Sequence, residues 1–374
     1  MHFGVLLLLA NASSGKTDPE LWKEEMELGV RLEDLGYDSV WVPEHHFDRP
    51  YCISPDPLQA LTYLAAKTST IKLGTGAIIL PWWKGQTDPI RLAERISMLD
   101  ALSDGRLLLG LGRGLARDEY EGFGVEMSES RERFFEAATM ILDGLENGYI
   151  DHDGKYYKQI RRDVFPKPER GFRDRIYNIA MSPESTLACG DFGGTMMCFN
   201  YQHEIDKQAE QFETWRARFR EKQGSEPPPP VLLDFAYCHE DAEIADRTMR
   251  NHLAPFYSAM VDHYEFDGLH FGKSKGYESY QEGATLLLES GREAGFEKFY
   301  GLQWKGTPEA MIEQMRRRIA LIGEFKQMLL VSYGGLPLET VQRSLKLIAD
   351  EVIPEVNKIA AEAARARTEA PVGA

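Results

Sequence analysis

The sequence predicts a (β/α)8 barrel that carries insertions between some of its units. Short apolar segments of strand character alternate with amphipathic segments of helical character, and there are eight of each. The strand-like segments are continuous apolar runs, which is typical of parallel strands buried on both faces. An open doubly wound sheet is the alternative arrangement. The strands are expected at residues 2–9, 39–43, 71–77, 106–112, 176–181, 195–199, 231–238 and 326–333.

Amphipathic segments lie between these strands, and several begin with a recognisable start signal. Thr17-Asp18-Pro19 and Thr307-Pro308-Glu309 each place a capping residue before a proline. Gly36 is expected to end the first helix, and the Ala/Arg-rich tail from Ala360 onwards is expected to fray. The helices are expected at 19–35, 57–68, 88–103, 129–147, 183–192, 204–222, 240–260 and 307–323.

The chain length bounds the domain organisation. With 374 residues and 43% hydrophobic content, the chain suits one large barrel or two smaller domains. Because the alternation runs along most of the chain, we expect one domain over residues 1–374. Two long connections interrupt it, an insertion at about 149–175 and a Gly-, Tyr- and Phe-rich stretch at about 261–305. Long loops in compact domains are usually functional, and we expect the second to form a lid.

Charge and cysteine content exclude several classes of function. The formal net charge of −16 disfavours binding to nucleic acid and to anionic membranes. Four cysteines without a C-x-x-C pair indicate reduced thiols in a cytoplasmic protein, with no metal site expected. The apolar start at residues 2–10 could be a signal peptide, but no Lys or Arg precedes it and the run is short. A buried first strand is the preferred interpretation.

Candidate functional residues follow the strand ends, where barrels form their active sites. His45 and His46 follow the second strand, and histidine can hold or deliver a proton near neutral pH. A structural, hydrogen-bonded pair is the alternative. Gly74, Gly76 and Ala77 in the third strand leave room for a flat molecule to approach the backbone, or serve tight packing inside the barrel.

The fourth and fifth strands end in residues suited to an anion. Arg113 lies in a G-x-G-x-G sequence that is a poor dinucleotide fingerprint, but its guanidinium at a strand end suits a phosphate. Met181 is followed by Ser182 and Ser185, whose hydroxyls at a helix start could cradle a phosphate with the free backbone N–H groups. Ordinary helix capping by Ser182 is the alternative.

Taken together, these residues resemble the bacterial luciferase-like flavin-dependent monooxygenase family, and its luciferase α subunit in particular. The pieces are short, but their order and spacing are jointly specific over nearly the whole chain. They are Glu44-His45-His46-Phe47, Gly74–Pro81, Pro89–Glu94, Leu99–Arg106, Arg113-Gly114-Leu115, Phe123-Gly124, Ser130-Arg131, Lys275-Gly276-Tyr277 and Gly306–Glu309.

The resemblance implies a two-component monooxygenase that binds reduced FMN supplied by a separate NAD(P)H:flavin reductase. Molecular oxygen would react with the flavin to a C4a-hydroperoxide, which oxygenates an apolar small organic substrate. A homodimer is the family's usual form. His45 is implied as the catalytic residue, and the Gly76–Ala77 peptide bond as a cis bond against the flavin. The implied cofactor-binding residues are Gly76, Ala77, Gly112, Arg113, Arg131, Met181, Ser182 and Ser185.

Other positions depart from the luciferase pattern. Gly112 stands in place of a cysteine, Met181 in place of an acidic residue and Asn200 in place of a tryptophan, while residues 82–88 lengthen the loop after the third strand. These departures weaken the expectation of light emission and of an aldehyde substrate. The residues expected to contact substrate or form the lid are Trp82, Trp83, Lys275 and Tyr277.

Two other functions remain as alternatives. A deazaflavin-dependent oxidoreductase on the same barrel would transfer hydride and use no oxygen. A non-catalytic flavin-binding subunit of a larger complex is the third. The presence of His45, Arg113 and Arg131 argues against the third, and the similarity over 44–47 and 275–277 argues against the second.

Overall fold

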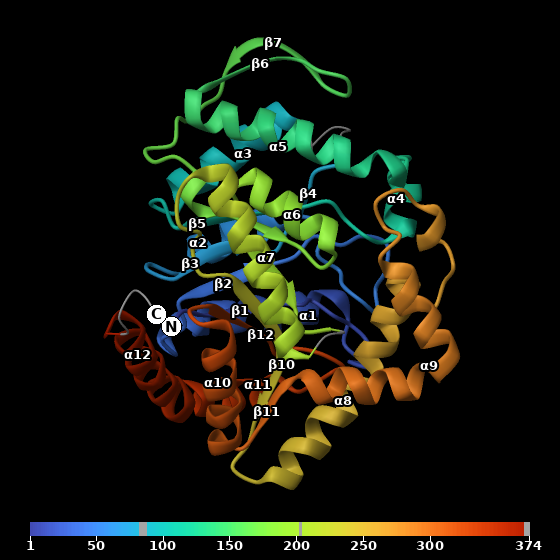
Figure 1. Cartoon of the computed structure of the whole chain (residues 1–374), viewed down its shortest axis with the longest axis vertical. Helices are drawn as coiled ribbons and strands as arrows, with labels where there is room; N and C mark the ends of the chain where they lie inside the picture. The colour runs from blue at the N-terminus through green and yellow to red at the C-terminus, as the bar shows by residue number, and fades with distance from the viewer. Residues whose placement is uncertain (82–87, 202–203, 370–374) are drawn as a thin grey trace.

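Eight parallel strands close into a barrel in the computed structural model, which describes residues 1–81, 88–201 and 204–369 (Figure 1). The closing pair joins the first strand to the last, with Phe3 beside Gln327 and Leu6 beside Leu330. In order around the barrel, the strands are β1 (Phe3–Leu6), β2 (Ser39–Val42), β3 (Lys72–Thr75), β5 (Leu107–Gly112), β8 (Ile176–Ile179), β9 (Thr195–Phe199), β10 (Val231–Cys238) and β12 (Lys326–Leu330).

Each of the eight predicted strands overlaps one strand of the barrel, so the predicted fold class is confirmed. The reason lies in burial, because all eight residues of β10 and all four of β1 are buried. Besides the hairpin described below, two short strands of the barrel sheet were not predicted, β4 (Ile78–Ile79) beside β5 and β11 (Trp304–Gly306) beside β10. Both are too short to give a periodic signal.

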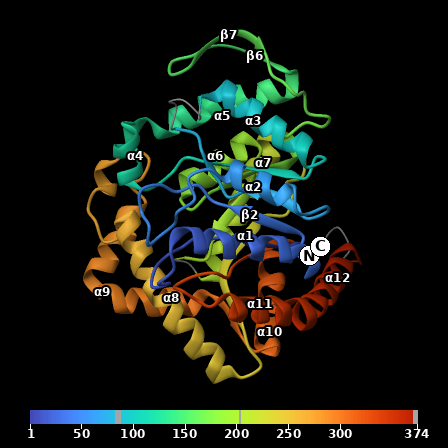
Figure 2. The same ribbon diagram turned by 180° about the vertical axis from the view of Figure 1, so that it is seen from behind.

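The eight predicted helices are also present around the barrel, and Figure 2 shows α1 and α2 from behind. Thr17 forms a capping box with Glu20 at the start of α1, and Thr307 caps α10 by accepting a hydrogen bond from the Ala310 N–H. The helices are α1 (Asp18–Asp34), α2 (Pro57–Ala65), α3 (Pro89–Leu102), α5 (Ser130–Asn147), α6 (Pro183–Phe192), α7 (Ile205–Gln223), α8 (Ala242–Tyr264) and α10 (Pro308–Ile322).

Four further α-helices lie outside the predicted set: α4 (Arg117–Phe123), α9 (Tyr280–Leu302), α11 (Leu338–Leu347) and α12 (Ile353–Glu369). The expectation that the tail frays from Ala360 is wrong for the described residues, because α12 continues through it. Arg367 Nη2 donates a hydrogen bond to the Ile319 carbonyl at 3.0 Å, which ties this helix to α10.

The two long connections have secondary structure of their own. The insertion at 149–175 folds as an antiparallel hairpin, β6 (Tyr149–Asp153) and β7 (Lys158–Asp163), which lies beyond α5 at the top of Figure 1. The segment at 261–305 contains the end of α8, a short turn at Phe271–Lys273 and α9. Among the described residues, no helix is long and apolar enough to cross a membrane.

Candidate active site

A cavity of about 220 Å³ opens at the carboxyl ends of the barrel strands, the end at which (β/α)8 barrels carry their sites. Its walls are mostly apolar and aromatic, and they include Leu8, Ile79, Phe199, Phe235 and Phe256. Polar groups converge on it from the ends of several strands. A largely dry cavity with a few placed polar groups is the usual form of a small-molecule site.

One end of the cavity is cationic. Arg113 follows β5 and Arg131 lies in the first turn of α5, and both line the cavity. Arg113 Nη1 and Arg131 Nη2 are buried and have no hydrogen-bond partner among the described residues. Burial, and then the charge of Arg113, lower the pKa of Arg131. A buried guanidinium leaves N–H groups unpaired only at a cost, so the pair points to an anionic ligand.

A neighbouring loop holds Arg113 in place. Its Nη2 donates to the Gly276 carbonyl at 3.0 Å, and its Cζ lies 3.9 Å from the ring centroid of Tyr277. The Tyr277 hydroxyl donates to the Gly114 carbonyl at 2.9 Å and lies 3.0 Å from that of Tyr120. The Tyr277 side chain is therefore buried under Arg113, and it lines the cavity.

The predicted serine pair is only partly directed at the cavity. Ser182 and Ser185 form a capping box at the start of α6, in which the Ser185 N–H donates to Ser182 Oγ and the Ser182 N–H to Ser185 Oγ. Ser185 lines the cavity and Ser182 does not. The geometry of Ser182 is thus that of an ordinary helix cap. Met181 lines the cavity, and its sulfur accepts a hydrogen bond from the Phe199 N–H at 3.2 Å.

Small residues shape one wall of the cavity. The Gly76–Ala77 peptide bond is cis, as the resemblance implies, and both residues line the cavity together with Gly112. A Cβ at Gly112 would lie 3.0 Å from Ile79 Cδ1 and 3.2 Å from Ala77 Cβ, so a side chain there would crowd this wall. Gly74 has the packing role, because a Cβ at this position would collide with the ring of Trp41.

The two adjacent histidines have different surroundings. His45 lines the cavity, and its Nε2 lies 3.4 Å from the Tyr264 hydroxyl. His46 is not among the lining residues. Its Nε2 lies 3.3 Å from Glu44 Oε1, and its ring packs edge-on against that of Phe123. His46 therefore has the structural, hydrogen-bonded role that was the alternative interpretation of the pair, whereas His45 faces the cavity.

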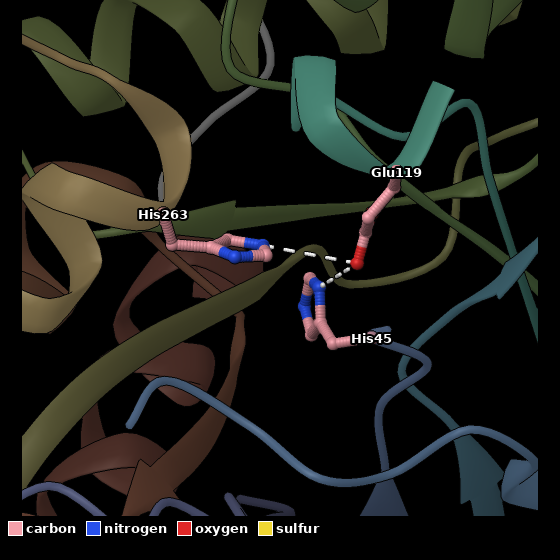
Figure 3. A group of neighbouring side chains, drawn as sticks. All are labelled: His45, Glu119 and His263. Carbon is pink, nitrogen blue, oxygen red and sulfur yellow. Dashed lines mark hydrogen bonds and ion pairs between the residues drawn. The ribbon is translucent and has the colours of Figure 1, made fainter. Parts of the chain in front are cut away.

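Behind His45 lies a set of buried ionisable groups that the sequence does not reveal. The Nδ1 of His45 lies 3.2 Å from Glu119 Oε1, and the Nε2 of His263 lies 3.8 Å from the same oxygen (Figure 3). Burial alone would raise the pKa of Glu119, but the charge and hydrogen bond of His45 hold it below the usual value. Burial also raises the pKa of Glu44 and lowers that of His263.

The residues expected at the lid and substrate positions have different outcomes. Tyr277 is buried, whereas Lys275 is exposed, with its Nζ 3.5 Å from Glu132 Oε1. Trp82 and Trp83 lie outside the described residues. Asn200 lines the cavity but is tied into the barrel interior by a hydrogen bond from its Nδ2 to Asp234 Oδ1 at 2.8 Å.

Comparison with known proteins identifies the family. Residues 1–324 match the model of the luciferase-like monooxygenases. The chain therefore belongs to the luciferase-like monooxygenase family, whose members are flavin-dependent oxidoreductases.

Two curated relatives match over almost their full length. The chain is 26% identical over 360 residues to the alkanal monooxygenase alpha chain of Photorhabdus laumondii, which covers 95% of this chain and 97% of that protein. It is 27% identical over 372 residues to the oxygenase component of the flavin-dependent trigonelline monooxygenase of Acinetobacter baylyi, with 95% of each chain covered. A more local match, 33% identical over 156 residues, spans 43% of an uncharacterized protein of Sinorhizobium fredii.

Solved structures with the same fold include enzymes with two kinds of cofactor. Monooxygenase RslO1 from Streptomyces bottropensis superposes with a TM-score of 0.79 at 23% identity, covering 95% of this chain and 99% of that one. The oxygenating constituent of 3,6-diketocamphane monooxygenase from Pseudomonas putida, solved with FMN, has a TM-score of 0.74 at 17% identity over 95% and 98% of the two chains. An F420-dependent secondary alcohol dehydrogenase has a TM-score of 0.68 at 17% identity, again over 95% and 98%.

Proposed function

We propose that the protein is the oxygenase component of a two-component FMN monooxygenase. It would take reduced FMN from a separate NAD(P)H:flavin reductase and use molecular oxygen to oxygenate an apolar small molecule. The observation that carries the proposal is the pair of unpartnered guanidinium groups, Arg113 Nη1 and Arg131 Nη2, at one end of an apolar cavity. The A. baylyi relative, named as an oxygenase component, supports the two-component assignment.

The residues present fit the FMN phosphate. Arg113 and Arg131 supply N–H donors, and in a chain of net charge −16 they place positive charge where an anion can enter. The Ser185 hydroxyl lies on the same cavity and could add a further donor. Gly76, Ala77 and Gly112 form a wall without large side chains, against which a flat ring could lie. Reduced FMN, when bound, would supply two electrons to dioxygen, so that one oxygen atom passes to the substrate and the other leaves as water.

His45 is the proposed acid–base group. Because a carboxylate only accepts hydrogen bonds, the Nδ1–H of His45 donates to Glu119 Oε1, and this contact orients the ring. The Nε2 then faces Tyr264 at the cavity wall, where it can accept or return a proton. Glu44 is a poorer candidate because its carboxyl is taken up by His46 and by the Ile79 N–H at 3.1 Å.

The cavity lining supports an apolar substrate. Its exposed lining is dominated by aliphatic and aromatic side chains, among them Phe199, Phe256 and Phe266. Such walls exclude water from the reacting groups and offer few hydrogen bonds to a polar substrate. We also propose that the chain is one domain and forms a cytoplasmic homodimer. Its net charge of −16 further suggests that it binds neither nucleic acid nor anionic membranes.

A second candidate is a deazaflavin-dependent oxidoreductase, because an F420-dependent enzyme shares the fold. The two are separated by an anaerobic titration of the protein with photoreduced FMN and with a reduced deazaflavin, followed by mixing with oxygen. The proposal is supported if the protein binds reduced FMN tightly and if the absorption spectrum shows that the bound flavin reoxidises more slowly than free FMN. Preference for the deazaflavin without oxygen uptake supports the second candidate. FMN binding with reoxidation identical to that of free FMN leaves only a non-catalytic flavin-binding subunit.

A further inference from the structure

His45, Glu119 and His263 bring two imidazoles and one carboxylate together from three separate segments. His45 follows β2, Glu119 lies on α4 and His263 lies on α8 (Figure 3). One ligand atom from each of the three residues lies within 4.8 Å of the others. Two histidines and one carboxylate are the ligand set of several zinc sites and of the non-haem iron sites.

Two atoms of this cluster are buried and lack partners. Glu119 Oε2 and His263 Nε2 have no hydrogen-bond partner among the described residues, and their side chains are only 1% and 2% exposed. Buried polar atoms of this kind are rare, and each one calls for a bound group or a water to satisfy it. The His263 Nε2 points toward Glu119 Oε1, so a group that satisfies this nitrogen would lie between the two side chains.

The neighbours of His263 favour the binding of a cation between its side chain and that of Glu119. Its Nδ1 lies 3.1 Å from Asp48 Oδ2, and a carboxylate there accepts the Nδ1 proton. A neutral imidazole carries one proton, so its Nε2 then presents a lone pair toward the second carboxylate, Glu119. A lone pair and a carboxylate oxygen facing each other at 3.8 Å repel unless a positive charge lies between them.

The second nitrogen of each histidine is held as in known metal sites. In such sites the ligating imidazole donates its other N–H to a carboxylate, carbonyl or water, which fixes the ring. Asp48 takes this position for His263, and the Tyr264 hydroxyl lies 3.4 Å from Nε2 of His45. Ligand bonds of about 2.0–2.1 Å in a tetrahedron place ligand atoms about 3.3 Å apart. The His45–Glu119 separation of 3.2 Å matches that value, whereas the His263–Glu119 separation of 3.8 Å is longer and the three ligand atoms lie within 4.8 Å of one another, so His263 would have to move toward the ion.

We propose that His45 Nδ1, Glu119 and His263 Nε2 form a binding site for one divalent transition-metal ion of the zinc class, with Asp48 orienting His263. Binding would displace the proton that His45 Nδ1 shares with Glu119, and that proton would pass to Nε2 beside Tyr264. The ion would lie beside the cavity, because neither Glu119 nor His263 lines it. Because His45 is also the proposed acid–base group, a bound ion would leave its Nε2 protonated, able to donate a proton but not to accept one. Zn²⁺ binding is measured without flavin, so its failure can be distinguished from failure of the proposed function.

The test is equilibrium dialysis of the chelator-treated full-length protein against Zn²⁺, with Co²⁺ absorption as a second readout. One tightly bound equivalent is expected, and a Co²⁺ spectrum without the thiolate band that the four buried cysteines would give. His263→Ala and Glu119→Gln should weaken Zn²⁺ binding at least a hundredfold. Asp48→Asn, which keeps all three ligands, should weaken it roughly tenfold, on the scale of lost outer-shell contacts.

The chain offers a matched control in His152, whose Nε2 lies 3.2 Å from Glu136 Oε1 but which joins no cluster of three metal-ligating side chains among the described residues. His152→Ala should bind Zn²⁺ as the unaltered protein does. Circular dichroism identifies any variant that fails to fold, and Asp48→Asn keeps the test informative in that case. One equivalent that survives His263→Ala, or no Zn²⁺ bound by the unaltered protein at micromolar concentration, overturns the proposal.

Discussion

The ring of Tyr277 lies under the guanidinium of Arg113, with Arg113 Cζ 3.9 Å from the ring centroid. This contact joins the segment after α8 to the end of β5 through a cation–π interaction and a hydrogen bond to the Gly276 carbonyl. The segment expected to act as a lid is therefore attached to the same residue that is proposed to hold the FMN phosphate. Closure of the segment and binding of the anion should be linked through Arg113.

Arg113→Ala should weaken binding of reduced FMN at least tenfold. The substitution removes a charge-assisted hydrogen bond worth about 1.5–3 kcal/mol. Arg161→Ala is the control, because Arg161 also stacks on a tyrosine, Tyr149, but lies on the β6–β7 hairpin. Anaerobic fluorescence titration of both variants measures the effect. Equal affinities of the two variants for reduced FMN would show that Arg113 does not bind the phosphate.

Gly276→Ala should also weaken FMN binding about tenfold, by displacing the arginines. Gly276 has φ +84°, and an added Cβ would lie 2.9 Å from Arg113 Nη1 and 3.6 Å from Arg131 Nη2. Gly291→Ala is a matched control, because φ is +81° there and no atom lies within 4 Å of the added Cβ. Both variants should lose stability through backbone strain, about 1–2 kcal/mol at Gly276 and up to about 3 kcal/mol at Gly291, whose ψ of 158° only glycine readily adopts. If Gly291→Ala impairs FMN binding as much, strain alone explains the effect.

His45→Ala should retain FMN binding and lose oxygen transfer by roughly a hundredfold, the scale of a lost general acid–base group. His46→Ala should cost less turnover and more stability. Without its imidazole partner, the buried Glu44 loses a hydrogen bond, and burial already raises the pKa of this carboxyl. The measurement is product formed per flavin oxidised, with thermal unfolding of both variants. Unchanged product yield from His45→Ala would make both histidines structural.

Trypsin should cleave the free protein at Lys273 and Lys275, and bound FMN should slow that cleavage several-fold. The reason is that Gly276 and Tyr277, next to Lys275, contact Arg113 at the cavity, and a ligand on Arg113 would stabilise this contact. Lys158 on the hairpin is the internal reference, because it is exposed and lies away from the cavity. Cleavage at Lys275 that follows Lys158 with and without FMN would show that the segment does not respond to flavin.

Glu25→Gln should stabilise the protein increasingly as pH rises. Burial raises the pKa of Glu25 to about 7 from the ordinary 4.5, so the folded state holds a proton that the unfolded state releases. Stability is therefore lost as pH rises from 4.5 through 7, and the loss approaches about 3 kcal/mol above that range. Chemical unfolding at several pH values measures the difference. Glu27→Gln, which replaces an exposed carboxylate on the same helix, should show no such trend. The prediction is contradicted if the stability of Glu25→Gln changes with pH in the same way as that of the unaltered protein.

The barrel can be predicted from the sequence because its strands are buried on both faces and so form apolar runs. The segment predicted at 231–238 coincides with β10. The hairpin gives no such signal, since β7 (Lys-Gln-Ile-Arg-Arg-Asp) is largely exposed and neither apolar nor alternating. Helix α9 is hidden for a different reason. Gly291 has a left-handed φ inside it and interrupts the helical pattern.

The candidate site can be predicted only in part. Arg113 is recognisable because it follows a strand, and strand ends converge at one end of a barrel. Nothing in the sequence relates Glu119 or His263 to His45, because the three meet only after distant segments pack together. The serine pair is ambiguous for a different reason. A helix start suits both a phosphate and a cap, and only the structure reveals that Ser182 is engaged with Ser185.

The pairing of β1 with β12 has a consequence for synthesis of the chain. Phe3–Leu6 can complete the barrel only after Gln327–Leu330 has left the ribosome. At typical translation rates this leaves the first strand with one edge unpaired for a time on the order of tens of seconds. An apolar strand with a free edge is prone to associate with other chains. The first strand thus needs protection by chaperones until β12 emerges, and expression at a lower temperature should favour recovery of folded protein.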